Sequence, residues 1–468
     1  MRERSLHGIG HVGLPVDVCA EKLNRKNGDA IVTMSTTDVL PAGESFEDRT
    51  YRKVTLKIVP ILVICYVAAY FDRVNISFAK LQMQSALGLS DTVYGLGAAI
   101  FFIGYFLFET PSNLILHRIG ARRWITRIMI SWGITSSAMM FVNGPVAFYV
   151  LRFLLGAFEA GFMPGVILYF TYWYPARRRA RMVALFMTGI AIAGTIGGPL
   201  AGFVMTKFNG IGGLAGWQWL MLVEGLPTIV LGVIVYLMLV DRIEDGKWLT
   251  HEEKTLLRDN LAAEVTPQHS HDVKSAFKNP YTALLALIYF LVLNGQFGLS
   301  FWMPQLIKNS GVSEPLSIGM LSAVPYAVTG LLMVLIGRSS DRTGERRVHL
   351  ALCIFAGTVG YCVCAWFSHN TVIATAGLSL AAVGIISSYG IFWTMPPKFL
   401  SGSAAAAGIA IINSIGNLGG FVSPYAIGKL TDMTGSTDLG MYVIAAMTAV
   451  AAVLVLFMIP KHICNDPA

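Results

Sequence analysis

Long apolar runs, separated by short polar turns, account for most of this 468-residue chain. Crossing a bilayer takes about 20 mostly apolar residues per α-helix, and twelve runs approach or exceed that length. The runs are continuous rather than alternating, which argues against a transmembrane β-barrel. The pattern predicts twelve membrane helices over 56–78, 92–114, 123–142, 146–170, 182–206, 217–240, 282–306, 316–337, 348–368, 371–394, 404–428 and 439–460.

Composition agrees with an all-α integral membrane protein. Hydrophobic residues make up 54% of the chain and charged residues only 13%, whereas a soluble domain carries about 25% charged residues. The twelve runs leave little chain for a soluble domain, and no metal cluster, nucleophile motif or glycine-rich phosphate loop stands out. We therefore expect no enzyme, no cofactor and no metal site.

The net charge of +8 could indicate nucleic-acid binding, but its distribution favours a membrane protein without a nucleic-acid partner. Arginine is concentrated in the short loops after runs 2, 4 and 8, and the alternate loops hold only single lysines. Cytoplasmic loops carry such an excess of Lys and Arg, so both termini are expected in the cytoplasm. These loops contain Arg118, Arg122 and Arg123; Arg177, Arg178, Arg179 and Arg181; and Arg338, Arg342, Arg346 and Arg347.

The chain divides at its one long connection. We expect a disordered cytoplasmic tail over 1–54, six helices over 55–240, a cytoplasmic linker over 241–281, six helices over 282–460 and a short cytoplasmic tail over 461–468. Residues 1–33 are either part of that tail or a mis-called start ahead of Met34. Thr250 and Glu253 match a capping box, which predicts a short helix within the linker.

Two repeated features indicate duplication of a six-helix unit. A tight basic turn follows run 2 (117–123) and run 8 (337–347), and runs 5 and 11 share a glycine-isoleucine pattern beginning at Gly189 and Gly408. Two parallel six-helix halves are the repeat plan of major facilitator transporters. The turns would act as gating loops through Arg118, Gly120, Arg122 and Arg123 in the first copy and Gly337, Asp341, Arg342, Gly344, Arg346 and Arg347 in the second.

Four charged residues lie within the apolar runs of the first half: Asp72, Arg73, Arg152 and Glu159. A charge at mid-membrane costs roughly 2.5–3.5 kcal/mol on insertion scales and indicates function by default. A carboxylate in a low-dielectric site takes up a proton more readily, and an arginine nearby favours its ionised form. An anion that competes for the arginine would therefore couple its binding to protonation. The alternatives are a static Arg152–Glu159 ion pair, and a position of Asp72 and Arg73 near the water boundary.

Neutral polar residues supply further candidates. Asn413 and Asn417 share one helix face, and Gln296 and Trp393 lie in runs 7 and 10. Such amides either bind substrate or simply bond to neighbouring helices. With Arg73 and Tyr70, these four residues form the predicted substrate-binding set. Glu109 and Glu224 are expected to be structural.

Several stretches resemble the anion:cation symporter family of the major facilitator superfamily, and most closely its bacterial tartrate/phthalate-type organic-acid permeases. In the first half they are YFDRVNI (70–76), GYFLFETPSNL (104–114), HRIGARRW (117–124), RFLLG with EAG (152–161) and YWYP (172–175); in the second half, SDRTGERR (340–347) and INSIGNLGG (412–420). The first loop departs from the superfamily motif, with Asn113 for Gly and His117 for Asp.

The resemblance implies proton-coupled uptake of a small organic anion through the bacterial inner membrane by alternating access. It implies that Arg73 contacts the substrate carboxylate, that Asp72 and Glu159 carry protons, and that Arg152 belongs to the coupling network. The transporter would act as a monomer. The alternative is a proton-coupled efflux antiporter, because Gly194, Gly197, Gly198, Pro199 and Gly202 faintly resemble an exporter signature.

Overall fold

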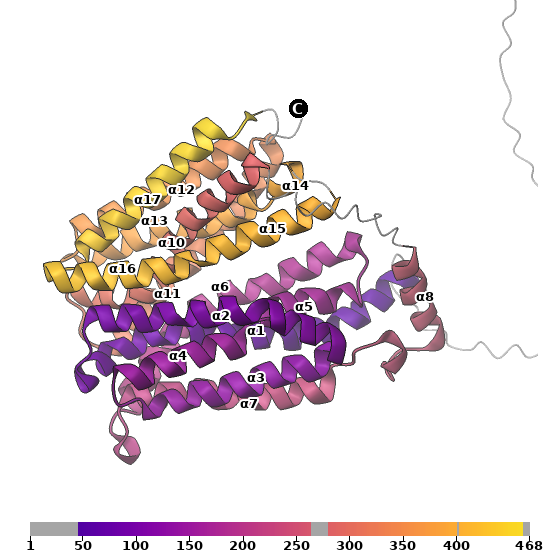
Figure 1. The fold of residues 1–468 in the computed structure, drawn as a ribbon, viewed down its shortest axis with the longest axis horizontal. Helices are drawn as coiled ribbons and strands as arrows, with labels where there is room; N and C mark the ends of the chain where they lie inside the picture. Colours follow the sequence, from indigo (N-terminus) through magenta and orange to yellow (C-terminus); the bar gives the residue numbers. More distant parts are fainter. Residues whose placement is uncertain (1–44, 264–278, 400–401, 462–468) are drawn as a thin grey trace, which may run out of the picture. The chain divides into compact units, whose positions relative to one another are not determined.

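Membrane helices dominate the computed structural model, which describes residues 45–263, 279–399 and 402–461 (Figure 1). The first set comprises α1 (Phe46–Leu87), α2 (Asp91–Ile119), α3 (Ala121–Ala138), α4 (Pro145–Glu159), α5 (Phe162–Thr171), α6 (Ala176–Lys207) and α7 (Gly216–Met238). The second set comprises α10 (Pro280–Asn309), α11 (Pro315–Thr343), α12 (Arg346–Trp366), α13 (Thr371–Phe392), α14 (Pro396–Phe399), α15 (Gly402–Asn417), α16 (Gly419–Thr434) and α17 (Asp438–Met458).

The helices cross the membrane twelve times, although two of the crossings do not meet a simple test of length and hydropathy. Ten segments of the described chain are long and apolar enough to cross a membrane. Helix α3 has 18 residues but carries Arg122, Arg123 and Arg127, and the eleventh crossing is divided between α15 and α16, of 16 residues each. Adding these two crossings gives the predicted all-α fold of twelve membrane helices.

The two sets pack by the same plan. Helix α3 lies against α7 as α12 lies against α17, α2 against α4 as α11 against α13, and α1 against α6 as α10 against α15. The interface between the sets is also reciprocal, because α6 packs on α11 and α2 packs on α16. This pseudo-symmetry confirms the duplication indicated by the repeated turns and glycine pattern.

Close helix contacts join the two sets at one end of the molecule. We call the end that carries α8 (His251–Ala262) the linker end, and the opposite end, with the α1–α2 and α10–α11 turns, the far end. A Cβ on Gly198 of α6 would lie 2.6 Å from the backbone oxygen of Gly319 of α11, so only glycine permits this approach. In the linker-end part of α11, five consecutive residues, 331–335, are all at least 38% exposed. Five consecutive helical residues point in every direction around the axis, so the other set does not cover α11 there.

Helix α1 begins at Phe46, well before the predicted first crossing at residue 56. The extension is held by charge and stacking: Asp48 pairs with Arg178 at 2.7 Å, and the Tyr51 ring stacks on Tyr174 with a centroid distance of 6.1 Å. Residues 46–54 are thus helical, although the sequence predicts them as part of a disordered tail. Residues 1–44, including the proposed alternative start, and 462–468 lie outside the described residues.

Two predicted crossings are broken helices. The fourth divides at Ala160 and Gly161, where Gly161 has φ of 87°, and the eleventh divides at Leu418. Glu159 is the last residue of α4 and Asn417 the last of α15, so each break lies beside a predicted site residue.

The described part of the linker contains the predicted short helix. The Thr250 hydroxyl accepts a hydrogen bond from the Glu253 N–H at 3.2 Å, and the Glu253 carboxylate accepts one from the Thr250 N–H at 2.8 Å. This reciprocal capping box opens α8, after the short η3 turn (Ile243–Asp245). Glu253 also pairs with Lys53 of α1 at 2.8 Å, which fixes α8 against the N-terminal extension.

Candidate functional site

Arg73 and Glu159 form an ion pair between α1 and the end of α4. The Arg73 Nη2 to Glu159 Oε1 distance is 2.6 Å, and Arg73 Nε donates to the same oxygen at 2.8 Å. The Glu159 side chain is 1% exposed and that of Arg73 is 25% exposed. The second carboxylate oxygen, Oε2, is buried and has no hydrogen-bond partner among the described residues. A buried charge is tolerated only when paired, and in this geometry each residue is the other's charge partner.

Aromatic rings of α2 complete the surroundings of Arg73. Its guanidinium carbon lies 5.5 Å from the ring centroid of Phe101 and 5.1 Å from that of Tyr105. A guanidinium within about 6 Å of an aromatic face is stabilised by the ring quadrupole. These rings would keep Arg73 in place when Glu159 is neutral.

Asp72 faces a different helix. Successive residues of an α-helix are about 100° apart, so Asp72 and Arg73 diverge from α1. The Asp72 carboxylate accepts a hydrogen bond from Trp132 Nε1 at 2.8 Å and another from the Ser136 hydroxyl, both on α3. Trp132 and Ser136 did not stand out in the sequence, although their spacing of four residues places them on one face of α3.

Arg152 lies fully inside the first set, 1% exposed. Its Nε donates to the Gly97 carbonyl at 3.3 Å and its Nη2 to the Ala98 carbonyl at 3.4 Å, and its guanidinium carbon lies 4.9 Å from the Phe101 centroid. The Asp72 and Glu159 carboxylates both attract it electrostatically. The ion pair of Glu159, however, is with Arg73, which differs from the alternative of a static Arg152–Glu159 pair.

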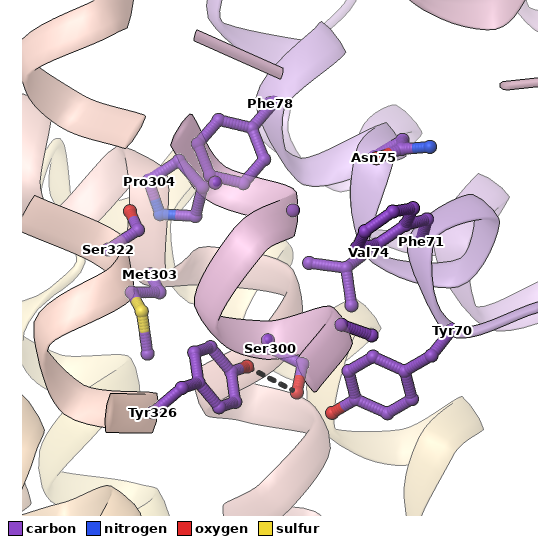
Figure 2. Close-up of a pocket in the computed structure, with 14 residues that line it drawn as sticks. Tyr70, Phe71, Val74, Asn75, Phe78, Ser300, Met303, Pro304, Ser322 and Tyr326 are labelled. Carbon is purple, nitrogen blue, oxygen red and sulfur yellow. Dashed lines mark hydrogen bonds between the residues drawn. The ribbon is translucent and has the colours of Figure 1, made fainter. Parts of the chain in front are cut away.

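A chain of neutral polar groups links the two sets near the middle of α1. Gln296 Nε2 of α10 donates to the Tyr70 hydroxyl at 3.2 Å and to the Ser300 hydroxyl at 3.1 Å. The Ser300 hydroxyl lies 3.4 Å from that of Tyr326 of α11 (Figure 2). Gln296 Oε1 is buried without a partner among the described residues. Two predicted site residues, Tyr70 and Gln296, are thus brought together across the interface.

A pocket lies between α1, α6, α10 and α11 beside this chain of groups (Figure 2). Its wall is apolar where Phe71, Val74 and Met303 line it, and polar at Tyr70, Asn75, Ser300, Ser322 and Tyr326. The described polar groups of this wall are neutral. The free space in this conformation is about 10 Å³, roughly that of one water molecule, so the pocket would have to widen to hold part of a substrate.

The remaining predicted binding residues lie elsewhere on the second set. The Trp393 ring is 5.0 Å from the Tyr289 ring, which also stacks on Phe392 at 4.9 Å. Asn413 and Asn417 are half-buried on α15, which packs against α10. None of these three has a described contact with the Arg73–Glu159 pair.

The first basic turn is anchored by a residue that the motif does not contain. The Arg122 N–H donates to Asp241 Oδ1 at 2.8 Å, and Arg122 Nε donates to the Tyr236 carbonyl of α7 at 2.5 Å. Gly120 has φ of 91°, and a Cβ there would lie 2.6 Å from Asp241 Oδ2. Asp241, just after α7, therefore provides a carboxylate at the N-terminus of α3 although the motif position holds His117.

The second basic turn uses the same type of anchor. Asp341 Oδ1 pairs with Arg346 Nη1 at 2.5 Å, and Gly344 ends α11 with φ of 65°. Arg347 Nη1 donates to the Ile459 carbonyl at 3.0 Å, just after α17. Each turn is thus tied to the end of the last helix of its own half.

No group of three or more His, Cys, Asp or Glu side chains suited to a metal ion occurs within the described ranges. Cys362 and Cys364 carry free thiols.

Comparison with known proteins identifies the family. The model of the Major Facilitator Superfamily matches residues 62–424. This chain belongs to that superfamily. It is a multi-pass membrane transporter and not an enzyme, and the resemblance to organic-acid permeases is confirmed by its relatives.

Two relatives and one solved structure are similar to this major facilitator protein over most of its length. A protein named "Putative tartrate transporter" from Agrobacterium vitis is 48% identical over 88% of this chain and 92% of its own. The "Quinolone resistance transporter" of Acinetobacter baumannii is 42% identical over 89% of this chain and 96% of its own. A bacterial homolog of the human lysosomal transporter Spinster matches with a TM-score of 0.71 at 17% identity, covering 91% of this chain and all of that one.

Proposed function

We propose that this protein takes up a small organic carboxylate together with protons by alternating access. The observation that carries the proposal is the Arg73–Glu159 ion pair, in which a partly exposed arginine is neutralised by a fully buried carboxylate. A substrate carboxylate that binds the Arg73 guanidinium competes with Glu159 for it. Once displaced, the buried Glu159 carboxylate has lost its counter-charge and gains a proton more readily.

This exchange couples the two bound species. Before binding, Arg73 is paired with Glu159. After binding, Arg73 is paired with the substrate carboxylate and Glu159 is a neutral acid. The loaded site therefore carries no additional net charge across the bilayer. Asp72 would serve as a second proton site, held by Trp132 and Ser136 on α3. Arg152, attracted by both carboxylates, would link their protonation states.

The neutral polar groups would recognise the rest of the substrate. Tyr70 of α1 and Gln296 of α10 are hydrogen-bonded to each other, and Tyr70 lies less than one helical turn before Arg73. Substrate hydroxyls can replace such bonds without leaving a charge unpaired. Together with the relative named for tartrate, this favours a hydroxy acid; a phthalate-like aromatic acid and a sugar acid are the other candidates.

The proposed orientation places the linker end in the cytoplasm of a bacterial cell, with the transporter in the inner membrane. The linker-end turns hold the arginines of both basic loops, whereas the far-end turns hold few positive charges. The excess of positive charge marks the cytoplasmic side. The exposed linker-end part of α11 then corresponds to an inward-facing state.

Uptake of labelled tartrate into proteoliposomes with an imposed pH gradient, acidic outside, tests the proposal. Accumulation that depends on the gradient and is abolished by a protonophore is expected. If tartrate, phthalate and gluconate all fail to accumulate, or accumulate without regard to the gradient, the proposal is wrong.

A second candidate is proton-coupled efflux of drugs. The glycines and proline between Gly194 and Gly202, and the relative named for quinolone resistance, favour it. A strain lacking this gene would then become more susceptible to quinolones, and a strain that expresses it from a plasmid more resistant. An unchanged susceptibility in both strains excludes this candidate.

A further inference from the structure

A buried lysine at the far end takes no part in the proposed substrate site. Lys80 lies on α1, seven residues after Arg73, and is 0% exposed. Its Nζ pairs with Asp91 Oδ1 of α2 at 2.7 Å. Complete burial of an ammonium group is unfavourable unless other groups compensate for the lost water.

The compensating group comes from the other half of the molecule. Lys80 Nζ lies 3.9 Å from the ring centroid of Trp302 on α10 and 5.0 Å from that of Tyr94 on α2. The Trp302 and Tyr94 rings meet edge to face at 5.6 Å, and the Tyr94 hydroxyl donates to the Phe301 carbonyl at 2.9 Å. A desolvated cation over a tryptophan face is stabilised by the quadrupole of the ring. The lysine of the first set therefore lies between a ring of its own set, Tyr94, and a ring of the second set, Trp302, which is the nearer of the two.

A carboxylate of the second set binds the start of α2. Asp432, in the last turn of α16, accepts hydrogen bonds from the Asp91 N–H at 3.0 Å and the Thr92 N–H at 2.7 Å. The N-terminus of a helix carries partial positive charge and unpaired N–H groups, so Asp432 adds from across the interface to the cap that Ser90 provides. Asp432 also attracts the Lys80 ammonium group.

A lysine of the second set also contacts the first set. Lys308 Nζ of α10 donates to the Leu81 carbonyl of α1 at 3.4 Å. Each half thus contributes charged side chains that contact the other half. The two halves approach closely here, because a Cβ on Gly95 of α2 would meet the backbone of Pro424 of α16.

We propose that Lys80, Asp91, Trp302 and Asp432 form a latch that holds the far end closed between transport cycles. The contacts of Lys80 with Trp302 and of Asp432 with the start of α2 exist only while the two halves touch at this end. When the halves separate there, water can solvate Lys80, Asp91 and Asp432, so that opening remains reversible. Because Lys80 and Arg73 share α1, a shift of that helix when the substrate leaves Arg73 would act directly on the latch. The assignment of the latch to the outside of the cell rests on the proposed orientation.

The latch can be tested by labelling a single cysteine placed behind it. Ser322→Cys, in a background without other cysteines, puts a thiol in the wall of the interface pocket, where Ser322 is 3% exposed. Lys80→Met and Asp432→Asn are added separately, and a membrane-impermeant maleimide is applied to intact cells. Lys207→Met and Asp438→Asn are the matched controls, since they remove a lysine of α6 and an aspartate of α17 at the same end outside the latch.

Each latch variant is expected to raise the labelling rate by about tenfold, the ratio that corresponds to loss of one hydrogen bond or ion pair to a charged group. The controls should label like the parent. Equal rates in the latch variants and the controls would overturn the proposal. Size-exclusion elution of the purified variants verifies folding, and Asp432→Asn, at an exposed position, keeps the test informative if Lys80→Met does not fold.

The assay uses no substrate and no pH gradient, so it can succeed even if the proposed transport reaction is wrong. Faster labelling in inside-out vesicles, in place of intact cells, would support the latch and reject the proposed orientation. Faster labelling from neither side would reject the latch and leave the transport proposal to its own experiment.

Discussion

The Glu159 carboxylate pairs with Arg73 of another helix, at 2.6 Å, although Arg152 lies two turns away on its own helix. Helix α4 ends at Glu159, and the break that follows separates it from α5. The pair therefore joins α1 to the break in the fourth crossing, where the helical hydrogen bonding is interrupted. Loss or formation of this ion pair can change the relation of these helices, whereas a pair within α4 could not.

Glu159→Gln is expected to separate coupling from exchange. The amide cannot gain or lose a proton, so gradient-driven accumulation in proteoliposomes should fall by at least about tenfold, the effect of removing one charged hydrogen-bond partner. Counterflow of labelled against unlabelled substrate needs no net proton movement and should persist. Glu252→Gln, on exposed α8, is the control and should leave both rates unchanged. Equal loss of both rates in Glu159→Gln would instead assign Glu159 a structural role.

Arg73→Lys tests whether the guanidinium itself binds the substrate. Lysine keeps the positive charge but cannot provide the planar fork that contacts a carboxylate through two N–H groups. We expect affinity for the transported acid, measured by isothermal titration calorimetry in detergent, to fall by roughly tenfold in Arg73→Lys and further in Arg73→Ala. Arg127→Lys is the matched control, since Arg127 stacks on Trp124 and Phe158 within the first set. An unchanged affinity in both Arg73 variants would exclude the residue from the site.

The sequence was sufficient for the crossings but not for the partners of the charged residues. Periodicity and charge placed Asp72, Arg73, Arg152 and Glu159 inside the membrane, and the resemblance gave them roles. Which arginine pairs with Glu159 depends on where α1 and the end of α4 lie relative to each other in the bundle, which the spacing within one helix cannot reveal. Likewise, Asp241 anchors the first basic turn from 119 residues away, so the turn motif alone could not identify it.

Trp132→Phe tests the contact that holds Asp72. Phenylalanine preserves the ring packing but removes the N–H that donates to Asp72 at 2.8 Å. A hydrogen bond to a buried charged group contributes about 1.5–3 kcal/mol, so the apparent melting temperature in detergent should fall. Trp302→Phe is not a suitable control because Trp302 belongs to the latch; Trp219→Phe removes an exposed indole bond to the Ile211 carbonyl and is preferable. If both variants melt alike, the Asp72–Trp132 bond contributes little to stability.

Gly120→Ala tests whether the first basic turn tolerates a side chain. Gly120 has φ of 91° and ψ of 151°, a backbone region almost exclusive to glycine, and a Cβ there would also collide with the Asp241 carboxylate. Gly210 has φ of 85° and ψ of −12°, the milder left-handed helical region, with open space where a Cβ would lie. Gly210→Ala should cost about 1 kcal/mol, and Gly120→Ala should be the less stable of the two in thermal unfolding. Equal destabilisation would show that neither the backbone region of Gly120 nor its contact with Asp241 matters for stability.

Glu253 predicts a pH-dependent attachment of α8 to α1. Partial burial raises the pKa of its carboxyl, but the hydrogen bonds from Lys53 and from the Thr250 N–H outweigh burial and hold the pKa below its usual range. A group whose folded pKa is depressed contributes stability above its unfolded pKa of about 4.3. That contribution is lost as the pH falls through the folded pKa. The attachment of α8 should therefore be complete at neutral pH and weaken below about pH 4.

Hydrogen exchange of the α8 amides, corrected for the intrinsic effect of pH, measures this attachment. Protection should decline between about pH 5 and pH 3 in the parent protein. In Glu253→Gln it should be lower at neutral pH and vary less over the same range, because the amide has no charge to lose. Lys53→Met should produce the same loss at neutral pH if the ion pair is the main cause. A parent whose α8 protection is constant down to pH 3 would show that apolar contacts, such as those of the buried Leu257, hold the helix without the ion pair.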